Sequence, residues 1–264
     1  MPELPDVEAF KQYLDATSLH KSIGRSTVHD ERILSGLSPQ RLGRGLKGAE
    51  FQESSRHGKY LFVKTSKGPW LLLHFGMTGE LQYSESDGDM PDHTRVSFHF
   101  KDGGRLDYVC QRLLGRVDLV DQVDSFVEDQ QLGPDALDAA ITPEWLYDQF
   151  STRPAPIKSA LMDQSLLAGI GNVYSDEILF QAGLRPETPA NRLSKQDVAH
   201  LRRTMRRVLR TTARHQADVA EFPRSYLTRQ REKGGQCPKC KGKLERHKVS
   251  GRTSYFCPKC QKKR

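Results

Sequence analysis

Four of the five cysteines stand in two pairs near the end of the chain, each within a Cys-Pro-Lys-Cys sequence. They are Cys237, Cys240, Cys257 and Cys260, and sixteen residues separate the two pairs. This spacing is typical of a site in which four thiolates bind one Zn²⁺ ion tetrahedrally. Four thiolates leave no position for water, so we expect a single structural zinc. Two disulfides are the alternative, although nothing in the sequence indicates an oxidising compartment.

The start of the chain, Met-Pro-Glu-Leu-Pro, is a second candidate for chemistry. Removal of Met1 would expose Pro2 as a secondary amine. A terminal amine has a pKa of about 7.7–8.0, so part of it is unprotonated at neutral pH. Such an amine can attack the C1′ of a sugar and form an iminium, with Glu3 as proton donor and acceptor. On these residues alone, an ordinary chain start is the better interpretation.

A glycine-rich turn before a predicted helix is a third candidate, within residues 161–184. Gly169 and Gly171 allow the backbone to approach a ligand closely, and Asn172 stands at the expected helix start. A helix start offers free N–H groups and a partial positive charge, which suit a phosphate. A tight connection between two helices, without any ligand, explains the turn equally well.

Net charge is unevenly distributed over the 264 residues. The whole chain has a net charge of +8, but residues 231–264 hold twelve Lys and Arg against two Glu, which leaves about −2 for residues 1–230. A strongly basic terminal segment is typical of nucleic-acid binding. A solvated, disordered tail is the alternative, and the cysteines in this segment argue against it.

Length and composition predict one large domain or two ordinary ones, since 36% of the residues are hydrophobic and 28% charged. No run of about 18 apolar residues exists, so we expect no membrane span. The first residues lack a basic region followed by an apolar one, so we expect no secretory signal and an intracellular, cytoplasmic protein.

Elements that would position the candidate residues follow from periodicity. Residues 3–16 predict a helix with Val7, Phe10, Tyr13 and Leu14 on one face. Strands are predicted at 60–64, 70–75, 94–100 and 105–110, and Gly and Asp turns at 67–68, 87–89 and 102–104. Short strands at this spacing predict a sandwich or a barrel, and Cys110 is expected in its core.

After Pro134 the pattern becomes helical, and the boundary falls near 125–142. Helices are predicted at 143–150, 157–162, 173–182 and 194–215. Ser194 is a plausible N-cap of the last helix, which has one apolar stripe. Its other faces carry Arg202, Arg203, Arg206, Arg207, Arg210 and Arg214.

Taken together, these features show that the chain resembles the formamidopyrimidine-DNA glycosylase and endonuclease VIII family, and most closely its formamidopyrimidine branch. Six segments match in family order and span nearly the whole chain. They are MPELPDVE (1–8), RHGKYLFV (56–63), LHFGMTGEL (73–81), LGPDAL (132–137), IKSALMDQ…GIGNVYSDEILF (157–180) and GRTSYFCPKCQ (251–261).

The resemblance implies an α+β fold in three parts. Residues 1–125 would form the N-terminal catalytic domain, a helix followed by a β-sandwich. Residues 126–230 would form a helical domain with a helix–two-turns–helix motif, and residues 231–264 the four-cysteine zinc ribbon. DNA would lie across the cleft between the two halves.

The resemblance also implies roles for the candidate residues. Pro2 would be the Schiff-base nucleophile and Glu3 the general acid and base. Lys59 would contact the phosphate next to the lesion and belong to the catalytic group. Asn172 and Arg252 would make two further phosphate contacts.

Four more residues carry implied DNA contacts. An enzyme that acts on C1′ must evict the nucleotide from the stack, and side chains should fill the void. Met77 matches the methionine that fills this void, and Arg112 matches the arginine that pairs with the orphaned base. His74 and Lys158 are weaker candidates for contact with the backbone or the lesion.

Three departures from the family pattern affect the expected lesion. Leu114 stands where guanine-lesion members carry an aromatic wedge, and Asp6 replaces a glutamate that supports the active site. Residues 215–236 contain no obvious equivalent of the Gly-Thr-rich loop that covers an everted 8-oxoguanine. The chemistry is unaffected, whereas the lesion spectrum is left open.

We therefore expect a bifunctional glycosylase and abasic-site lyase that removes oxidised or ring-opened purines and cleaves by β- and δ-elimination. Its partner would be double-stranded DNA with a damaged base or abasic site, and it would act as a monomer associated with the nucleoid. The same chemistry on oxidised pyrimidines or another lesion is one alternative. A non-catalytic binder of damaged DNA is another, although Pro2, Glu3 and Lys59 together argue against it.

Overall fold

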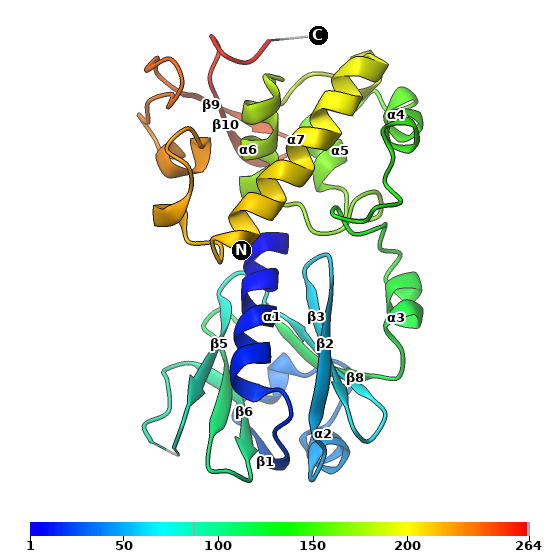
Figure 1. Ribbon diagram of the computed structural model, residues 1–264, viewed down its shortest axis with the longest axis vertical. Helices are drawn as coiled ribbons and strands as arrows, with labels where there is room; N and C mark the ends of the chain where they lie inside the picture. Colours follow the sequence, from blue (N-terminus) through cyan, green and yellow to red (C-terminus); the bar gives the residue numbers. More distant parts are fainter. Residues whose placement is uncertain (87, 263–264) are drawn as a thin grey trace. The chain divides into compact units, whose positions relative to one another are not determined.

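The computed structural model describes residues 1–86 and 88–262 and divides them into two compact units (Figure 1). The first contains residues 1–2 and 6–130, and the second contains residues 3–5 and continues from residue 131. Asp87, within the turn expected at 87–89, and residues 263–264 of the expected zinc ribbon lie outside the described residues. Among the described residues, no helix combines the length and apolar character that a membrane crossing needs.

The first unit is a sandwich of two antiparallel sheets. One has the order β1–β6–β7–β5 and the other β2–β3–β4–β8. The strands are β1 (Ile23–Val28), β2 (Phe51–His57), β3 (Tyr60–Thr65), β4 (Trp70–His74), β5 (Gly79–Ser84), β6 (Thr94–Phe100), β7 (Arg105–Cys110) and β8 (Arg116–Val120). Apolar side chains from both sheets form one core, which contains Leu61, Leu73, Phe98 and Cys110. The four predicted strands and the buried position of Cys110 are confirmed.

Helix α1 (Leu4–Ser18) confirms the first predicted helix. Val7 and Leu14 are buried and Phe10 packs against the sandwich core. Tyr13 was expected on the same face but is 39% exposed, and its hydroxyl accepts a hydrogen bond from the backbone N–H of Tyr83. The short helices α2 (Pro39–Leu46) and α3 (Val123–Asp129) were not predicted.

The second unit is helical and ends in a two-stranded hairpin. Its helices are α4 (Pro143–Ser151), α5 (Ile157–Met162), α6 (Asn172–Ala182) and α7 (Lys195–Arg214). Helices α5 and α6 with the turns between them form the expected helix–two-turns–helix. Ser194 caps α7 as predicted, and it does so in a capping box with Asp197. Short 3₁₀ helices η2 (Ala190–Arg192), η3 (Val219–Glu221) and η4 (Leu227–Gln230) connect these elements, as does η1 (Glu31–Ile33) in the first unit.

The C-terminal hairpin pairs β9 (Glu245–Val249) with β10 (Arg252–Phe256). Phe256 and Leu244 pack with Phe180 of α6 and with Cys237 and Cys257 in a separate small core. This core is small, so a metal is expected to supply part of its folding energy.

Candidate functional site

The carboxylate of Glu3 caps the start of α6. Its Oε2 accepts hydrogen bonds from the backbone N–H of Gly171 (2.7 Å) and Tyr174 (3.1 Å), and its Oε1 accepts one from Val173 (2.8 Å). Glu3 is only 1% exposed. A Cβ at Gly171 would lie 2.5 Å from the Glu3 carboxyl carbon, so any larger residue there would displace Glu3. The geometry fixes this carboxylate against the positive end of a helix.

This cap corrects one expectation. The free N–H groups of the α6 start were expected to suit a phosphate, but three of them bind a carboxylate of the chain itself. The side chain of Asn172, the first residue of α6, remains as the phosphate candidate. Its Oδ1 is buried and has no hydrogen-bond partner among the described residues. An amide oxygen only accepts hydrogen bonds, so a phosphate would bind the Nδ2 donor of this side chain and not Oδ1.

Lys158 lies in the interior of the second unit. It is fully buried, and its Nζ donates to Asp176 Oδ1 at 2.6 Å. Burial is the main cause that lowers the Lys158 pKa below its ordinary value, and Asp176 opposes it. A direct contact of Lys158 with DNA therefore stays a prediction, and it would require this buried ion pair to break.

Asp176 is the residue that sequence reasoning missed. Besides Lys158, its carboxylate accepts hydrogen bonds from Ser254 Oγ (2.6 Å), Arg231 Nε (2.9 Å) and the backbone N–H of Tyr255 (3.1 Å). It thereby joins α5, α6 and β10. A signal was present in the sequence, because two adjacent acids, 176 and 177, directly precede the apolar residues 178–180 of the same helix.

Arg252 is the first residue of β10 and is exposed. It follows the tight turn at Ser250 and Gly251, both with positive φ. The next residues of β10 contact the Asp176 network: the carbonyl of Thr253 accepts hydrogen bonds from Lys158 and Arg231. Arg231 also donates to the carbonyl of Asn172 at 3.3 Å. The two phosphate candidates of the second unit are thus held by one network.

In the first unit, Lys59 and His74 lie close together. Lys59 follows Gly58 in the turn between β2 and β3, and it is partly buried. His74 ends β4 opposite Tyr60, and the two rings lie 4.8 Å apart. Burial, then the charges of Lys59 and Arg116, lower the pKa of His74 to about 4. His74 is therefore a neutral hydrogen-bonding group at pH 7.

The void-filling candidates lie on two neighbouring loops of the first unit. The backbone N–H of Arg112 donates to Thr78 Oγ1 at 3.1 Å. Gly76, at φ +56°, leaves no room for a side chain, because a Cβ there would lie 2.3 Å from the carbonyl of Leu114. Met77 and Leu114 are 40% and 52% exposed, and Arg112 is also exposed. These side chains therefore share one surface.

Pro2 is partly buried at the chain start, behind the exposed Met1. While Met1 is present, the Pro2 nitrogen belongs to a peptide bond and is not nucleophilic. The structure thus divides the predicted residues into two groups. Pro2, Lys59, His74, Met77 and Arg112 belong to the first unit, and Glu3, Lys158, Asn172 and Arg252 to the second.

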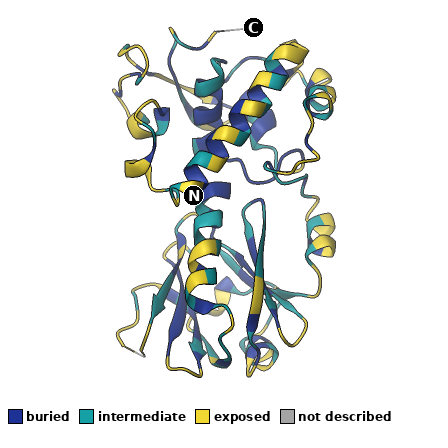
Figure 2. Cartoon of the chain, viewed as in Figure 1, coloured by how far each residue is buried: buried dark blue, intermediate teal, exposed yellow. Residues whose placement is uncertain are grey.

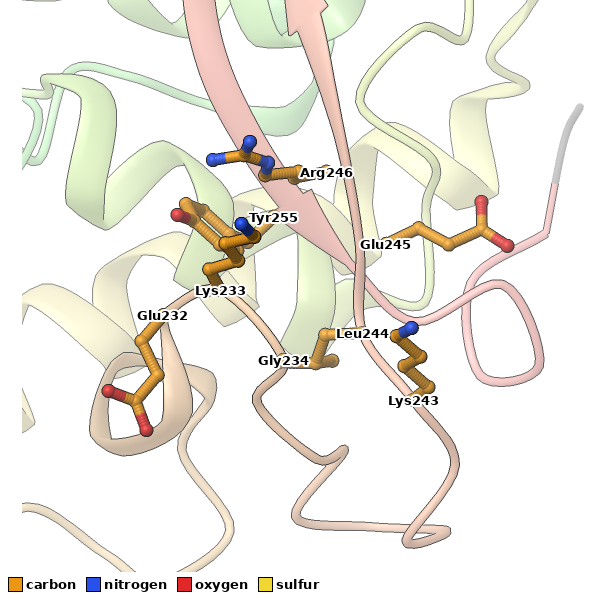
Figure 3. A pocket seen from close by; sticks show the side chains of 8 residues that line it. All are labelled: Glu232, Lys233, Gly234, Lys243, Leu244, Glu245, Arg246 and Tyr255. Atoms are coloured by element: carbon orange, nitrogen blue, oxygen red, sulfur yellow. The ribbon is translucent and has the colours of Figure 1, made fainter.

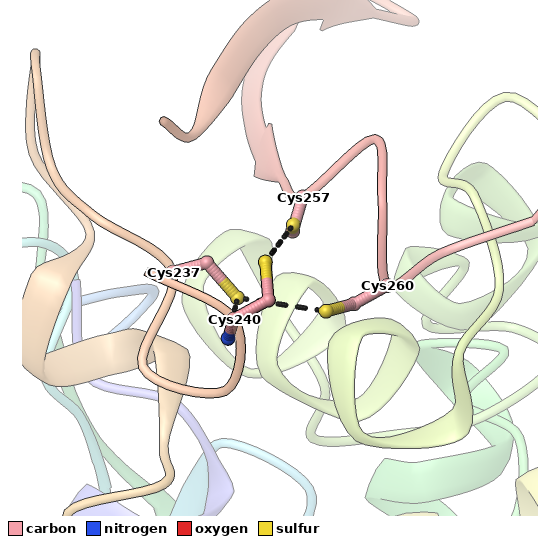
Figure 4. Close-up of side chains that lie close together, drawn as sticks. All are labelled: Cys237, Cys240, Cys257 and Cys260. Carbon is pink, nitrogen blue, oxygen red and sulfur yellow. Dashed lines mark hydrogen bonds between the residues drawn. The ribbon is translucent and has the colours of Figure 1, made fainter. Parts of the chain in front are cut away.

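The four cysteines form a metal centre (Figure 4). All four Sγ atoms lie within 4.8 Å of one another, with Cys237 and Cys260 at 3.7 Å and Cys240 and Cys257 at 3.5 Å. Tetrahedral zinc with Zn–S bonds of about 2.3 Å places its sulfurs about 3.8 Å apart. The donor set therefore fits one structural Zn²⁺, and the cysteines are not joined as disulfides.

An open pocket of about 450 Å³ lies beside the hairpin (Figure 3). Three cationic side chains, Lys233, Lys243 and Arg246, line it together with Glu232, Glu245 and Tyr255. Its charges are mixed, and none of the predicted catalytic or DNA-binding residues lines it, so we do not assign it to the proposed reaction.

Three family models match the chain. The formamidopyrimidine-DNA glycosylase N-terminal domain matches residues 1–117, and the H2TH domain of the same enzymes matches residues 132–223. The zinc finger found in FPG and IleRS matches residues 234–263.

Relatives match over the full length. A formamidopyrimidine-DNA glycosylase of Pelotomaculum thermopropionicum is 33% identical over 99% of both chains. One of Moorella thermoacetica is 37% identical over 98% of this chain and 92% of its own. The solved structure of the Lactococcus lactis enzyme bound to DNA with an abasic site covers 99% of this chain and 100% of its own, at 26% identity and a TM-score of 0.90. The structure of the same enzyme bound to DNA with N7-benzyl-Fapy-dG has 27% sequence identity to this chain and a TM-score of 0.88. It covers the same shares of both chains.

Proposed function

Since this chain belongs to the formamidopyrimidine-DNA glycosylase family, we infer that it excises oxidised or ring-opened purines from DNA and cleaves the strand at the abasic site. The observation that carries this proposal is likeness over the whole chain to enzymes of that name, including one bound to abasic-site and Fapy-dG DNA. The buried, helix-capping Glu3 directly after Pro2 supports the chemistry.

The proposed reaction begins once Met1 has been removed. The Pro2 nitrogen forms a bond to C1′, and the glycosidic bond breaks, so that the base leaves with the bonding electrons and takes up a proton. Loss of the proton on Pro2 and opening of the sugar ring produce an iminium. Glu3 donates and accepts the protons of these steps.

Strand cleavage follows from the iminium, which makes the C2′ proton acidic. Loss of that proton expels the 3′ phosphate by β-elimination, and δ-elimination then expels the 5′ phosphate. Water finally hydrolyses the bond to Pro2 and regenerates the amine. The zinc takes no part in these steps, since its four protein ligands leave no position for water or substrate.

We propose the following DNA contacts for the other residues. Lys59, Asn172 and Arg252 bind phosphates around the lesion, and their charges or amides offset the cost of evicting the nucleotide. Met77 and Arg112 fill the void in the duplex, a role that their exposure on one surface supports. His74 contributes a neutral hydrogen bond. Lys158 is assigned to the Asp176 network, and its contact with DNA stays a prediction.

The proposal includes three functional parts: a catalytic domain at 1–125, a helix–two-turns–helix domain at 126–230 and a zinc ribbon at 231–264. The compact units divide after Gln130, so all of α3 lies in the first unit and the division falls five residues beyond the first proposed boundary. We also propose a monomer, because one chain contains every part needed. An intracellular, nucleoid-associated location would follow from action on chromosomal DNA.

Borohydride trapping on an abasic duplex tests the amine mechanism. We expect a covalent protein–DNA adduct from protein whose mass shows that Met1 is absent. The matched control is the same chain with an uncleaved N-terminal extension, which blocks the amine and should give no adduct. Equal trapping and strand cleavage by the blocked chain would refute Pro2 as the nucleophile.

A further inference from the structure

Four exposed arginines form a straight stripe along α7. Arg203, Arg207, Arg210 and Arg214 are spaced by four, three and four residues, which places them on one side of a helix. They are the only exposed residues from 203 to 214. The opposite side of α7 is buried, and Figure 2 shows the two contrasting faces of this helix. We call these four residues the arginine stripe.

The stripe does not hold the fold together. Within the part of the chain that the structure describes, none of its four guanidinium groups has a hydrogen bond or an ion pair. Two other arginines of α7 differ in this respect: Arg202 donates to the carbonyl of Ile141, and Arg206 donates to those of Leu137 and Asp138.

The stripe also has an electrostatic cost. Arginines at i and i+4, as in 203 and 207 or 210 and 214, repel each other and destabilise a helix. The only acid of α7 is Asp197, which serves in the capping box. The helix alone has a net charge of +6, within a chain whose total is +8. An anionic partner would offset this repulsion.

Within the second unit, the stripe is separate from the phosphate candidates Asn172 and Arg252. Helix α6 packs against both α7 and β10, and it contacts α7 through the buried side of that helix. The stripe faces away from this packing. A ligand of the stripe therefore occupies a different surface of the unit from a ligand of Arg252.

We propose that the arginine stripe is a second DNA-binding surface, which holds the phosphate backbone of undamaged duplex outside the lesion. The stripe contains no aromatic or apolar side chain, whereas protein–protein interfaces have an apolar core. One guanidinium group can donate two parallel hydrogen bonds to two oxygens of a phosphate. From residue 203 to residue 214 the helix rises about 17 Å, and one DNA strand offers about five phosphates over that length. The inference rests on the proposed function, in that the chain must bind DNA.

The test compares two variants that each lose four positive charges. In the first, all four stripe arginines become Gln, which preserves helix propensity. In the second, Arg41→Gln, Arg44→Gln, Lys47→Gln and Lys101→Gln remove four exposed cations of the first unit. The dissociation constant for an undamaged duplex of about 60 base pairs is measured as a function of salt concentration. Binding and single-turnover excision are also measured on a duplex of about 13 base pairs with one formamidopyrimidine.

We expect the stripe variant to bind the long duplex about tenfold more weakly near 0.1 M salt. Its log–log salt slope should fall by about 0.9 for each phosphate that the variant no longer neutralises. Affinity and excision on the short lesion duplex should stay unchanged, and the control variant should match the wild type on both.

Three results would overturn the inference. Equal reductions in both variants would show an effect of net charge alone. An unchanged long-duplex affinity in the stripe variant would exclude the surface. Binding of both variants to a polyglutamate peptide is measured in parallel. If the stripe variant lost this binding but kept its DNA affinity, the partner of the stripe would be an acidic protein instead of DNA. Failure of the wild type to excise the lesion would contradict the proposed function, independently of the stripe.

Discussion

Glu3 combines two tasks in one side chain, because the carboxylate assigned to proton transfer also closes the start of α6. A helix start leaves backbone N–H groups unsatisfied, and Glu3 satisfies three of them. This arrangement holds the carboxylate in one orientation. It also links the chain start, which carries the proposed nucleophile, to the helix that begins with Asn172.

Glu3→Gln tests both tasks. The amide offers one acceptor oxygen in place of two, so at least one N–H of α6 loses its partner, and we expect a loss of about 1–3 kcal/mol in the free energy of unfolding. Base excision should fall by at least about 100-fold, since general acid–base catalysis is removed. Borohydride trapping on a preformed abasic site should fall much less. Unchanged excision would remove Glu3 from the mechanism.

His74 predicts a pH dependence of stability. Its pKa is about 4 in the folded protein and near 6.5 when unfolded, so between these values the unfolded chain binds more protons. Stability should therefore decline as pH falls from about 6.5 to about 4, by at most about 3 kcal/mol from this residue, and be unaffected by it above 6.5. Denaturant unfolding of His74→Gln should show a correspondingly flatter profile. An identical pH profile in the variant would contradict the assignment.

At the scale of elements, the first two turns of α6 connect several parts of the second unit. Glu3 caps its start, while Asp176 one turn later binds α5 through Lys158 and β10 through Ser254 and Tyr255. The hairpin that presents Arg252 is thus attached to the same helix as Asn172. The spacing between these two phosphate candidates depends on one buried carboxylate.

Asp176→Asn should loosen this attachment. The substitution leaves the buried Lys158 and the partly buried Arg231 without their counter-charge, and breaking a buried pair in this way costs about 3–5 kcal/mol. We expect affinity for an abasic duplex to fall about tenfold, with zinc still bound because the thiolates are untouched. Combined with Arg252→Ala, the two effects should be less than additive, since both act through one phosphate contact.

Asp107→Asn is the matched control for Asp176→Asn. Asp107 is also fully buried and paired with an arginine, Arg105, but it lies in the sandwich of the first unit. It should reduce thermal stability comparably and leave the affinity for abasic DNA unchanged. Equal reductions of affinity in both variants would show that Asp176 acts only through stability.

At the scale of the whole molecule, the segment between α7 and Cys237 bears on the choice of lesion. It is built into the second unit: Thr228 donates from N and Oγ1 to Glu177 Oε2 at 2.7 and 2.6 Å, and Phe222 and Leu227 are buried. Burial raises the pKa of Glu177, and the bonds from Thr228 and Gln181 oppose that rise. The segment is therefore anchored to the second unit at Phe222, Leu227 and Thr228.

A panel of defined lesions tests the consequence. Anchoring at these residues restricts how the segment can fold over an everted base, so we expect formamidopyrimidine to be excised faster than 8-oxoguanine opposite cytosine, by about tenfold or more. Both should be excised faster than thymine glycol. Rates would be measured in single turnover with each lesion in the same sequence. Excision of thymine glycol with 8-oxoguanine untouched would contradict the assignment to the purine branch.

Local patterns in the sequence were sufficient for several features. The strands at 94–100 and 105–110, the capped helix α7 and the four zinc ligands all depend on residues close together in the chain, where periodicity and spacing act directly. The helix α2 was missed because it is short and contains Gly43 and Gly45, which are poor helix formers. The assignment to a family rested on the order of six motifs and was confirmed by full-length relatives.

What the tertiary structure decided is which charged groups face each other. Lys158 and Asp176 are 18 residues apart, and Asp176 and Ser254 are 78 apart. Nothing in their local sequence shows that they meet, so Lys158 was expected at the DNA and Asp176 was overlooked. The α6 start likewise appeared open to phosphate until folding brought Glu3 to it from 168 residues away. Spacing along the chain determines helices, strands and close ligand pairs, whereas the partner of a buried charge depends on long-range packing.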